Sequence, residues 1–341
     1  MIEQGYERGS CATATAAGDE APACALTLRR RDGRFERLIR SAHLSRPEHY
    51  LSVYQSGCNH TCRKCHSSEF SQRATGRWLS SDDIAELARQ YERQVTYVEP
   101  RERATMYHAT TLCRGCGSCV LHGRTHRLCP GALRTDELVL SHQGVGPARN
   151  IVAFTGGDIA CRADFYAEAT TAIKQACRSM WVLIETNGYG LTRENLDLLA
   201  DAGVDSFWLD IKAYDGGTYR TLCGISNEVV LRAPAEIMER GFVLEALSLV
   251  IPGWVGVGEI GRIAGLLADL DPAIPFTILA FFPAYELSSV RSPTVSEMLA
   301  AHQAAARAGL RNIRLGNLGI FAKTAKDQER VLAAIGREGL G

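Results

Sequence analysis

The sequence predicts an α/β fold built on a parallel sheet. Short runs of β-branched and aromatic residues alternate along the chain with longer amphipathic segments. The short runs are almost continuously apolar, as expected of strands that are buried on both faces. Alternation of this period is typical of βαβ units, whose strands lie parallel. With 341 residues, the chain is long enough for one large domain or two modest ones.

The individual elements follow from this periodicity. The predicted strands lie at 50–57, 150–156, 181–187, 205–212, 242–251, 276–282 and 312–317. The predicted helices lie at 81–94, 162–178, 193–201, 230–240, 257–270, 294–308 and 325–336. Residues 80–83, "SSDD", predict a capping box that opens the first helix. Only residues 95–149 interrupt the alternation, and their Arg-, Gly- and Cys-rich composition predicts an insert after the first βα unit.

Composition excludes several classes of protein. Lys plus Arg and Asp plus Glu both total 38, so nothing indicates a general nucleic-acid binder or a membrane-surface protein. Residues 1–30 lack the pattern of a secretory signal and are expected to form a flexible tail. Seven of the 12 cysteines fall into two clusters with ligand-like spacing, which favours metal binding in a reducing cytoplasm over disulfides.

The first cluster consists of Cys58, Cys62 and Cys65, spaced C-x3-C-x2-C. It directly follows the first predicted strand, where a parallel barrel carries its active-site loops. Three thiolates can hold an iron–sulfur cube by three corners and leave one iron without a protein ligand. The alternative is a structural zinc site, with His60 or His66 as the fourth ligand.

Three further motifs follow successive predicted strands. They are "TGGD" at 155–158, "ETNG" at 185–188 and "LDIK" at 209–212. Each motif alone is also compatible with an ordinary turn or strand end. Together with the three cysteines, in this order, the chain resembles the radical S-adenosylmethionine (radical SAM) superfamily. From about residue 50 to 320 it is most similar to the branch of the pyruvate formate-lyase activating enzymes.

The resemblance implies a fold and a domain organisation. The fold is a partial parallel (β/α)6 barrel of the TIM type, with a small ferredoxin-like, cysteine-rich insert. The radical SAM core spans 45–320, the insert 95–149, and a C-terminal helix 321–341. We expect both cysteine clusters to lie at the C-terminal ends of the strands.

The resemblance also implies the residues around the cofactor. In the family, the open iron binds the amino and carboxylate groups of SAM. The implied contacts to SAM, and to a monovalent cation beside it, are Gly156, Gly157, Asp158, Glu185, Thr186, Asp210, Lys212, His66 and Tyr285. Asp158 replaces the family's Glu, so the amine contact is expected to run more through backbone carbonyls. Lys64 replaces an aromatic residue, and Tyr285 replaces a His.

The second cluster consists of Cys113, Cys116, Cys119 and Cys129, followed by Pro130. C-x2-C-x2-C followed by a distant Cys-Pro is the ligand pattern of bacterial ferredoxins, with a longer last spacer. These four thiolates predict one closed [4Fe–4S] cluster. The alternative is a zinc knuckle in which His122 or His126 replaces a thiolate.

These features predict a radical SAM oxidoreductase with two [4Fe–4S] clusters. Reductive cleavage of SAM would yield a 5′-deoxyadenosyl radical, which abstracts hydrogen from an unidentified small molecule or protein. The second cluster would relay electrons from a donor such as flavodoxin or ferredoxin. One alternative is an activase that installs a glycyl radical on a partner protein. The other is a non-catalytic electron-transfer protein, which has no need for the Gly-Gly-Asp motif.

Overall fold

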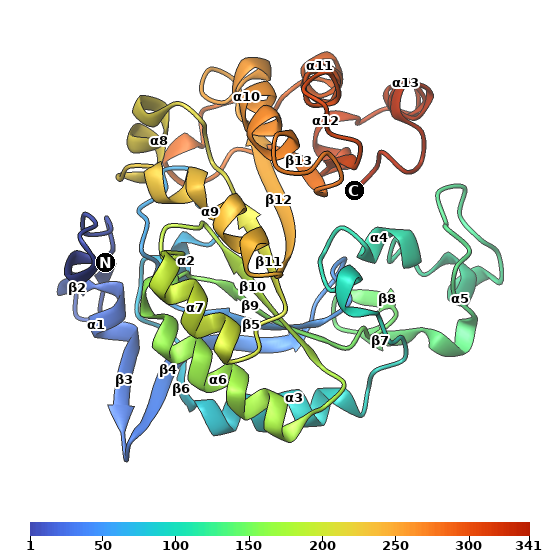
Figure 1. The fold of residues 1–341 in the computed structure, drawn as a ribbon. Helices are drawn as coiled ribbons and strands as arrows, with labels where there is room; N and C mark the ends of the chain where they lie inside the picture. Colours follow the sequence, from blue (N-terminus) through green and yellow to red (C-terminus); the bar gives the residue numbers. More distant parts are fainter.

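The computed structural model describes residues 1–341 and is organised around a ten-stranded sheet (Figure 1). Six parallel pairings join seven strands in the spatial order β5, β9, β10, β11, β12, β13 and β14. These strands are β5 (Leu51–Gln55), β9 (Ile151–Gly156), β10 (Trp181–Thr186), β11 (Ser206–Asp210), β12 (Val243–Val250), β13 (Phe276–Ala280) and β14 (Ile313–Gly316). The predicted parallel α/β fold is therefore confirmed, with one parallel strand more than a six-stranded barrel has.

An antiparallel edge extends this sheet beyond β5. The long strand β4 (Arg34–Leu44) pairs antiparallel with β5, with β3 (Leu28–Arg31) and with β6 (Arg77–Ser80). The path of paired strands runs from β14 to β3 without joining its two ends, so the barrel is partial. The sequence did not predict these edge strands, because their many arginines hide any apolar run.

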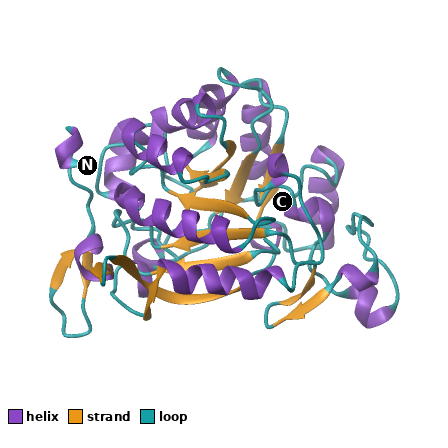
Figure 2. Cartoon of the chain, turned by 60° about the horizontal axis from the view of Figure 1, so that its bottom comes forward, coloured by secondary structure: helices purple, strands orange, loops and turns teal.

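Helices cover the outside of the sheet (Figure 2). All seven predicted helices are present, as α3 (Ser81–Glu92), α6 (Ala163–Ala176), α7 (Arg193–Asp201), α9 (Glu228–Glu239), α10 (Val257–Ala268), α11 (Val295–Arg307) and α13 (Ala325–Ile335). The capping box formed by Ser80 and Asp83 is also present. The sequence did not predict α8 (Gly216–Cys223), which begins with two glycines that are poor helix formers. The remaining helices are short: α1 (Ala23–Thr27), α2 (Ser68–Ser71), α4 (Ala109–Leu112), α5 (Ser118–His122) and α12 (Leu318–Phe321). None of the helices has the length and apolarity needed to cross a lipid bilayer.

Alternate side chains of the parallel strands face two different environments. Phe154 and Ile184 belong to the large core beneath the helices. Ala153 and Leu183, one residue earlier on the same strands, belong to a small separate cluster with Tyr50. Because side chains alternate along a strand, this small cluster marks the concave interior of the barrel.

The insert and the N-terminal segment lie at opposite ends of the strands (Figure 1). The insert, which includes the hairpin of β7 (Val139–Ser141) and β8 (Gly144–Gly146), contacts the N-terminal ends. There Ser206 Oγ donates to Ala104 O at 2.6 Å, and Tyr107 N donates to Glu245 Oε2 at 2.6 Å. The insert therefore closes the N-terminal end of the barrel.

The N-terminal segment, expected to be a flexible tail, packs at the C-terminal end instead. It forms the hairpin of β1 (Ala12–Ala14) and β2 (Glu20–Pro22), and Thr13 within it is buried. Ser10 Oγ accepts from Thr61 N at 3.0 Å and donates to Cys223 O at 2.9 Å. The segment thereby backs the loop that carries the first cysteines.

We expect the docking of the insert to depend on a buried ion pair. Arg149 and Glu99 are fully buried and lie 3.1 Å apart, and Arg149 also donates to the carbonyls of Arg103 and Thr105. Arg149→Met should lower the free energy of unfolding by about 1–3 kcal/mol, because it leaves the buried carbonyls of Arg103 and Thr105 without a donor, although Glu99 keeps its pair with Arg103. Chemical denaturation measures this loss. Arg134→Met, which breaks an exposed pair with Asp136, is the control. A similarly small loss in both variants would contradict this role of Arg149.

Candidate active site

The three predicted cysteines lie on one loop between β5 and α2. Cys62 is buried, whereas Cys58 and Cys65 are half-buried. Gly57 N donates to Phe70 O at 2.9 Å, which closes the loop on itself. Cys65 Sγ lies 3.1 Å from Ser71 Oγ, within hydrogen-bonding distance. The loop sits at the C-terminal end of β5, as the sequence predicts.

The Gly-Gly-Asp loop after β9 packs directly on the cysteine loop. Gly157 N donates to Gln55 O at 2.8 Å, and Asn59 N donates to Asp158 O at 2.7 Å. A Cβ atom on Gly157 would lie only 2.3 Å from Gly57 O. Two backbones therefore meet at a distance that only glycine permits.

The carboxylate of Asp158 joins this loop to the next one. Its Oδ1 accepts from Ala160 N at 2.7 Å. Its Oδ2 accepts from Thr186 Oγ1 at 2.7 Å and from Asn187 N at 2.8 Å. Burial raises the pKa of Asp158, although these three donors oppose the shift. Both oxygens are thus engaged within the protein, whereas Gly156, two residues earlier, is exposed.

Two residues beside the cysteines were not singled out from the sequence. Asn187 Nδ2 donates to Asn59 Oδ1 at 2.6 Å and lies 3.8 Å from Cys58 Sγ. Cys223, set aside because it lacks ligand spacing, is buried next to Cys62. A hydrogen bond from the Cys223 thiol lowers the pKa of Cys62 despite its burial. Asn187 lies within the "ETNG" motif, so only its role was missed, but Cys223 carries no local signal.

Lysines contribute positive charge on one side of the cysteine loop. Lys212 forms an ion pair with Asp210, and Lys64 lies 3.7 Å from the same carboxylate. Burial acts to raise the pKa of Asp210, but Lys212 and Lys64 more than offset it and lower that pKa. Asp210 Oδ1 is buried without a hydrogen-bond partner. Lys64, a departure from the family pattern, therefore belongs to this charged group.

The other residues expected around a cation are held apart. Glu185 accepts from Tyr50 Oη at 2.9 Å and from Thr155 Oγ1 at 2.6 Å, and burial raises the pKa of Glu185 to about 8. Tyr285 is 44% exposed, and its hydroxyl donates to Gln72 Oε1 at 2.8 Å. The exposed His66 lies near Phe282, with the two rings tilted by 59° and their centroids 6.2 Å apart. The structure thus brings Lys212 and Asp210 together, but it does not bring Glu185, Thr186, Asp210 and Tyr285 to one point.

The four cysteines of the insert converge on one small cavity. The cavity has a volume of about 20 Å³ and is lined by Cys113, Cys116, Cys119 and Cys129, together with His126 and Val145. Gly115 N donates to Cys113 Sγ at 3.3 Å, so a backbone amide already faces a sulfur. No three His, Cys, Asp or Glu side chains in the protein are arranged to hold a single metal ion.

The position of this second set corrects one expectation. His49 Nε2 lies 3.1 Å from Cys113 O, and His49 O accepts from Arg149 N at 2.7 Å. Both of these residues precede a parallel strand. The second set therefore lies at the N-terminal ends of the strands, and the prediction that both sets share the C-terminal face is wrong. The six residues of β9, at about 3.3 Å each, separate the two ends by roughly 20 Å.

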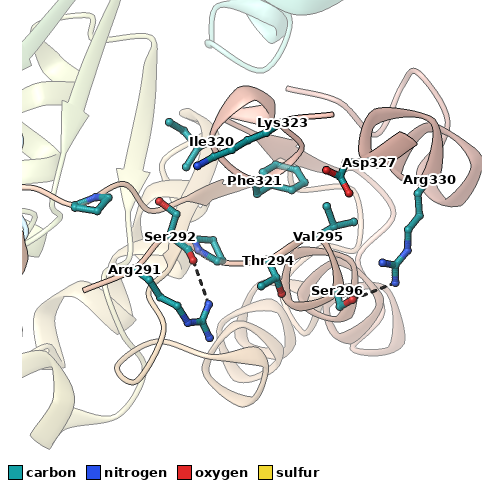
Figure 3. A pocket seen from close by; sticks show the side chains of 12 residues that line it. Arg291, Ser292, Thr294, Val295, Ser296, Ile320, Phe321, Lys323, Asp327 and Arg330 are labelled. Carbon is teal, nitrogen blue, oxygen red and sulfur yellow. Dashed lines mark hydrogen bonds between the residues drawn. The ribbon is translucent and has the colours of Figure 1, made fainter. Parts of the chain in front are cut away.

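A larger pocket lies outside both cysteine sets. It has a volume of about 630 Å³ and lies between the loop after β13, the start of α11 and the segment α12–α13. Figure 3 shows two hydrogen bonds among the lining residues, from Arg330 to Ser296 Oγ and from Arg291 to Ser292 O. No cysteine lines this pocket.

Comparisons with known proteins agree with the geometry. Residues 115–256 match the sequence model of the radical SAM superfamily. The match begins inside the insert, and so it does not include the loop of Cys58, Cys62 and Cys65. The chain is thus similar to the radical SAM superfamily over less than half of its length.

One relative has a more specific name than the superfamily. A provisionally named glycyl-radical enzyme activating enzyme of Methanocaldococcus jannaschii is 28% identical over 158 residues. The alignment covers 45% of this chain and 58% of that protein. The chain is thus similar to that protein over less than half of its own length and spans less than two thirds of that relative.

The solved structures are less similar in sequence than this relative. A domain of a pyruvate-formate lyase-activating enzyme from Bacteroides vulgatus is 20% identical, with a TM-score of 0.40 and coverage of 47% of this chain and 95% of that chain. HydG, a maturase of the [FeFe]-hydrogenase, is 14% identical, with a TM-score of 0.49. The match covers 85% of this chain and 54% of that chain.

Gly157→Ala should disrupt the contact between the two loops, because the new Cβ would overlap Gly57 O. We expect a loss of about 1–3 kcal/mol in the free energy of unfolding and a lower iron content. Thermal denaturation and iron analysis of the anaerobically reconstituted protein measure both effects. Gly258→Ala in α10 is the control, because its Cβ would meet nothing within 4 Å. Normal stability and iron content in Gly157→Ala would refute the close contact.

Proposed function

We propose that the protein is a radical SAM enzyme whose active site is the loop of Cys58, Cys62 and Cys65. The observation that carries this proposal is the direct packing of the Gly-Gly-Asp loop on the cysteine loop at the C-terminal ends of β5 and β9. A [4Fe–4S] cluster held by the three thiolates would supply an open iron for SAM and the electron that cleaves it. The need for thiolate ligands favours a reducing compartment such as the cytoplasm.

The protein's own residues fit such a group. Cys62 has a lowered pKa, and Asn187 and Ser71 present polar groups to the sulfurs of Cys58 and Cys65. Hydrogen bonds to the sulfurs and nearby charge are the means by which a protein tunes an iron–sulfur centre. Lys212 and Lys64 would offer positive charge to a carboxylate.

In this proposal, Asp158 positions the site and does not bind the amine of SAM itself. Its two carboxylate oxygens already accept three hydrogen bonds from the protein. An ammonium group would then be bound by backbone carbonyls of the exposed Gly156 region. This agrees with the shorter reach of Asp compared with Glu.

Substrate chemistry would take place inside the barrel. Thr155, Glu185 and Trp208 face the interior, where they are partly exposed, and the indole N–H of Trp208 is buried without a partner. The insert closes the far end, so a substrate would enter from the C-terminal side. The name of the related Methanocaldococcus jannaschii protein favours, as a second candidate, an activase that acts on a glycyl radical enzyme.

The second cysteine set would hold an auxiliary [4Fe–4S] cluster. Its cavity is lined by all four thiols, which supports this assignment, although His126 of the zinc-knuckle alternative lines the same cavity. The separation of roughly 20 Å weakens the expected role as a direct relay to the first cluster. Arg114, between two of the cysteines, donates to the carbonyls of Arg337 and Leu340 near the C-terminus. We infer that this cluster fixes the insert, since a metal site contributes folding energy.

Replacing Cys58, Cys62 and Cys65 together by Ala should abolish formation of 5′-deoxyadenosine from SAM. The protein should stay brown, because the four cysteines of the insert remain. Anaerobic incubation with SAM and a reductant, followed by chromatography, measures the product. Retained 5′-deoxyadenosine formation in the triple variant would refute the assignment of the active site.

The Cys116→Ala variant distinguishes between two roles of the second cluster, which either stabilises the fold or relays electrons to the first cluster. If the cluster fixes the insert, the variant should melt at lower temperature, and its SAM cleavage per folded molecule should match the parent with any donor. The rates are compared with reduced flavodoxin and with a small chemical reductant, at matched occupancy of the first cluster. A loss seen with flavodoxin and rescued by the small reductant would instead show a relay.

A further inference from the structure

Arg37 is a charged residue buried beneath the cysteine loop. It lies on β4 next to β5, and its side chain is fully buried. Its Nη2 donates to Gly57 O at 3.1 Å, and its Nη1 donates to Thr27 O at 3.0 Å. Gly57 directly precedes Cys58, so the guanidinium holds the residue from which the first cysteine extends.

No carboxylate pairs with this guanidinium. Its remaining bonds go to neutral oxygens of Thr27 and Gln55. The other fully buried arginine, Arg149, instead forms an ion pair with Glu99 at 3.1 Å. A buried charge without a counter-charge is costly, so such a group is normally paired. Arg37 is therefore a fully buried cation that forms no ion pair with a carboxylate of the protein.

The groups that can carry negative charge near Arg37 point to the missing partner. They are Tyr166, Cys58, Asp158 and Cys161. Tyr166 is a buried phenol whose pKa is raised, so it stays neutral. Cys161 has a pKa that burial raises to about 12, so it also stays neutral. The Asp158 carboxylate keeps its charge, but its oxygens accept from three other donors and it forms no ion pair with Arg37. The remaining group is the Cys58 sulfur, which becomes anionic when it ligates iron.

We propose that Arg37 is the buried counter-cation of the first iron–sulfur cluster, and that its charge raises the reduction potential of that cluster. It is a positioning residue and does not touch SAM. This inference rests on the proposed function, because it needs a cluster on Cys58. Lys64 and Lys212 supply positive charge near Cys62, and Arg37 supplies it through β4 beneath Cys58.

The direction of the effect follows from charge balance. A one-electron reduction adds one negative charge to the cluster and takes up no atom. A fixed cation nearby stabilises the reduced state more than the oxidised state, and burial strengthens the attraction. Removal of the cation should therefore make the cluster harder to reduce.

Three variants separate the effect of the Arg37 charge from the effect of changing the shape of its side chain. Arg37→Gln removes the charge, Arg37→Lys keeps it, and Arg40→Gln removes an exposed charge from the same strand. The signal of the first cluster is identified as the one missing from the Cys58/Cys62/Cys65 triple variant. Its potential is measured by electron paramagnetic resonance during anaerobic redox titration with dithionite.

We expect Arg37→Gln to lower the ratio of reduced to oxidised cluster at a fixed potential at least tenfold, which for one electron is about 59 mV. Arg37→Lys and Arg40→Gln should titrate close to the parent. An unchanged potential in Arg37→Gln, or an equal shift in Arg37→Lys, would overturn the proposal. The measured reduction potential does not depend on SAM cleavage. If the proposed function were wrong, the parent protein would form no 5′-deoxyadenosine, and this result would be seen separately.

A second measurement covers the case in which Arg37→Gln fails to retain the cluster. Without iron the substitution removes only hydrogen bonds to neutral oxygens, so it should cost the apoprotein less stability than it costs the iron-bound protein. With iron bound, it should decrease stability. Chemical denaturation of both forms, with Arg37→Lys as the control, measures the difference. Equal destabilisation of both forms would show that Arg37 only supports the fold.

Discussion

The site depends on the set of hydrogen bonds made by Asp158. Its carbonyl accepts from Asn59 on the cysteine loop, and its carboxylate accepts from Ala160, Thr186 and Asn187. One residue thereby ties the loops after β5, β9 and β10 together at the open end of the sheet. Since the carboxylate is buried and charged, each of its three bonds is stronger than one between neutral groups. Loss of this residue would free three loops at once.

A second constraint separates the functions of the two ends of the barrel. The C-terminal ends carry the cysteine loop, the charged pair of Asp210 and Lys212, and the partly exposed interior residues. The N-terminal ends are closed by the insert, through Tyr107 and Glu245 among others. This arrangement gives the interior a single entrance. It also keeps the four cysteines of the insert away from the proposed active site, which agrees with the stabilising role proposed for them.

The sequence predicts those parts of the fold and site that have a local pattern. The parallel strands and long helices have clear periodicity, and the cysteine spacing and the loops after β9, β10 and β11 are short motifs. Residues such as Arg37 and Cys223 have no such pattern, because they reach the site only through tertiary packing. The same is true of the N-terminal segment, whose polar composition suggests a tail although Ser10 bonds to Thr61. The insert was placed at the wrong end because an insertion without periodicity does not indicate which face it covers.

The most direct measurement of the proposed activity uses SAM labelled with nitrogen-15 in its amino group. The anaerobically reconstituted protein is reduced, mixed with labelled SAM and frozen, and electron–nuclear double resonance is recorded on the cluster signal. Binding of the amine to the open iron predicts a hyperfine coupling to nitrogen-15 in the parent protein. Absence of this coupling at saturating SAM, in a protein with a reduced first cluster, would contradict the assignment of the cysteine loop as a SAM-binding site.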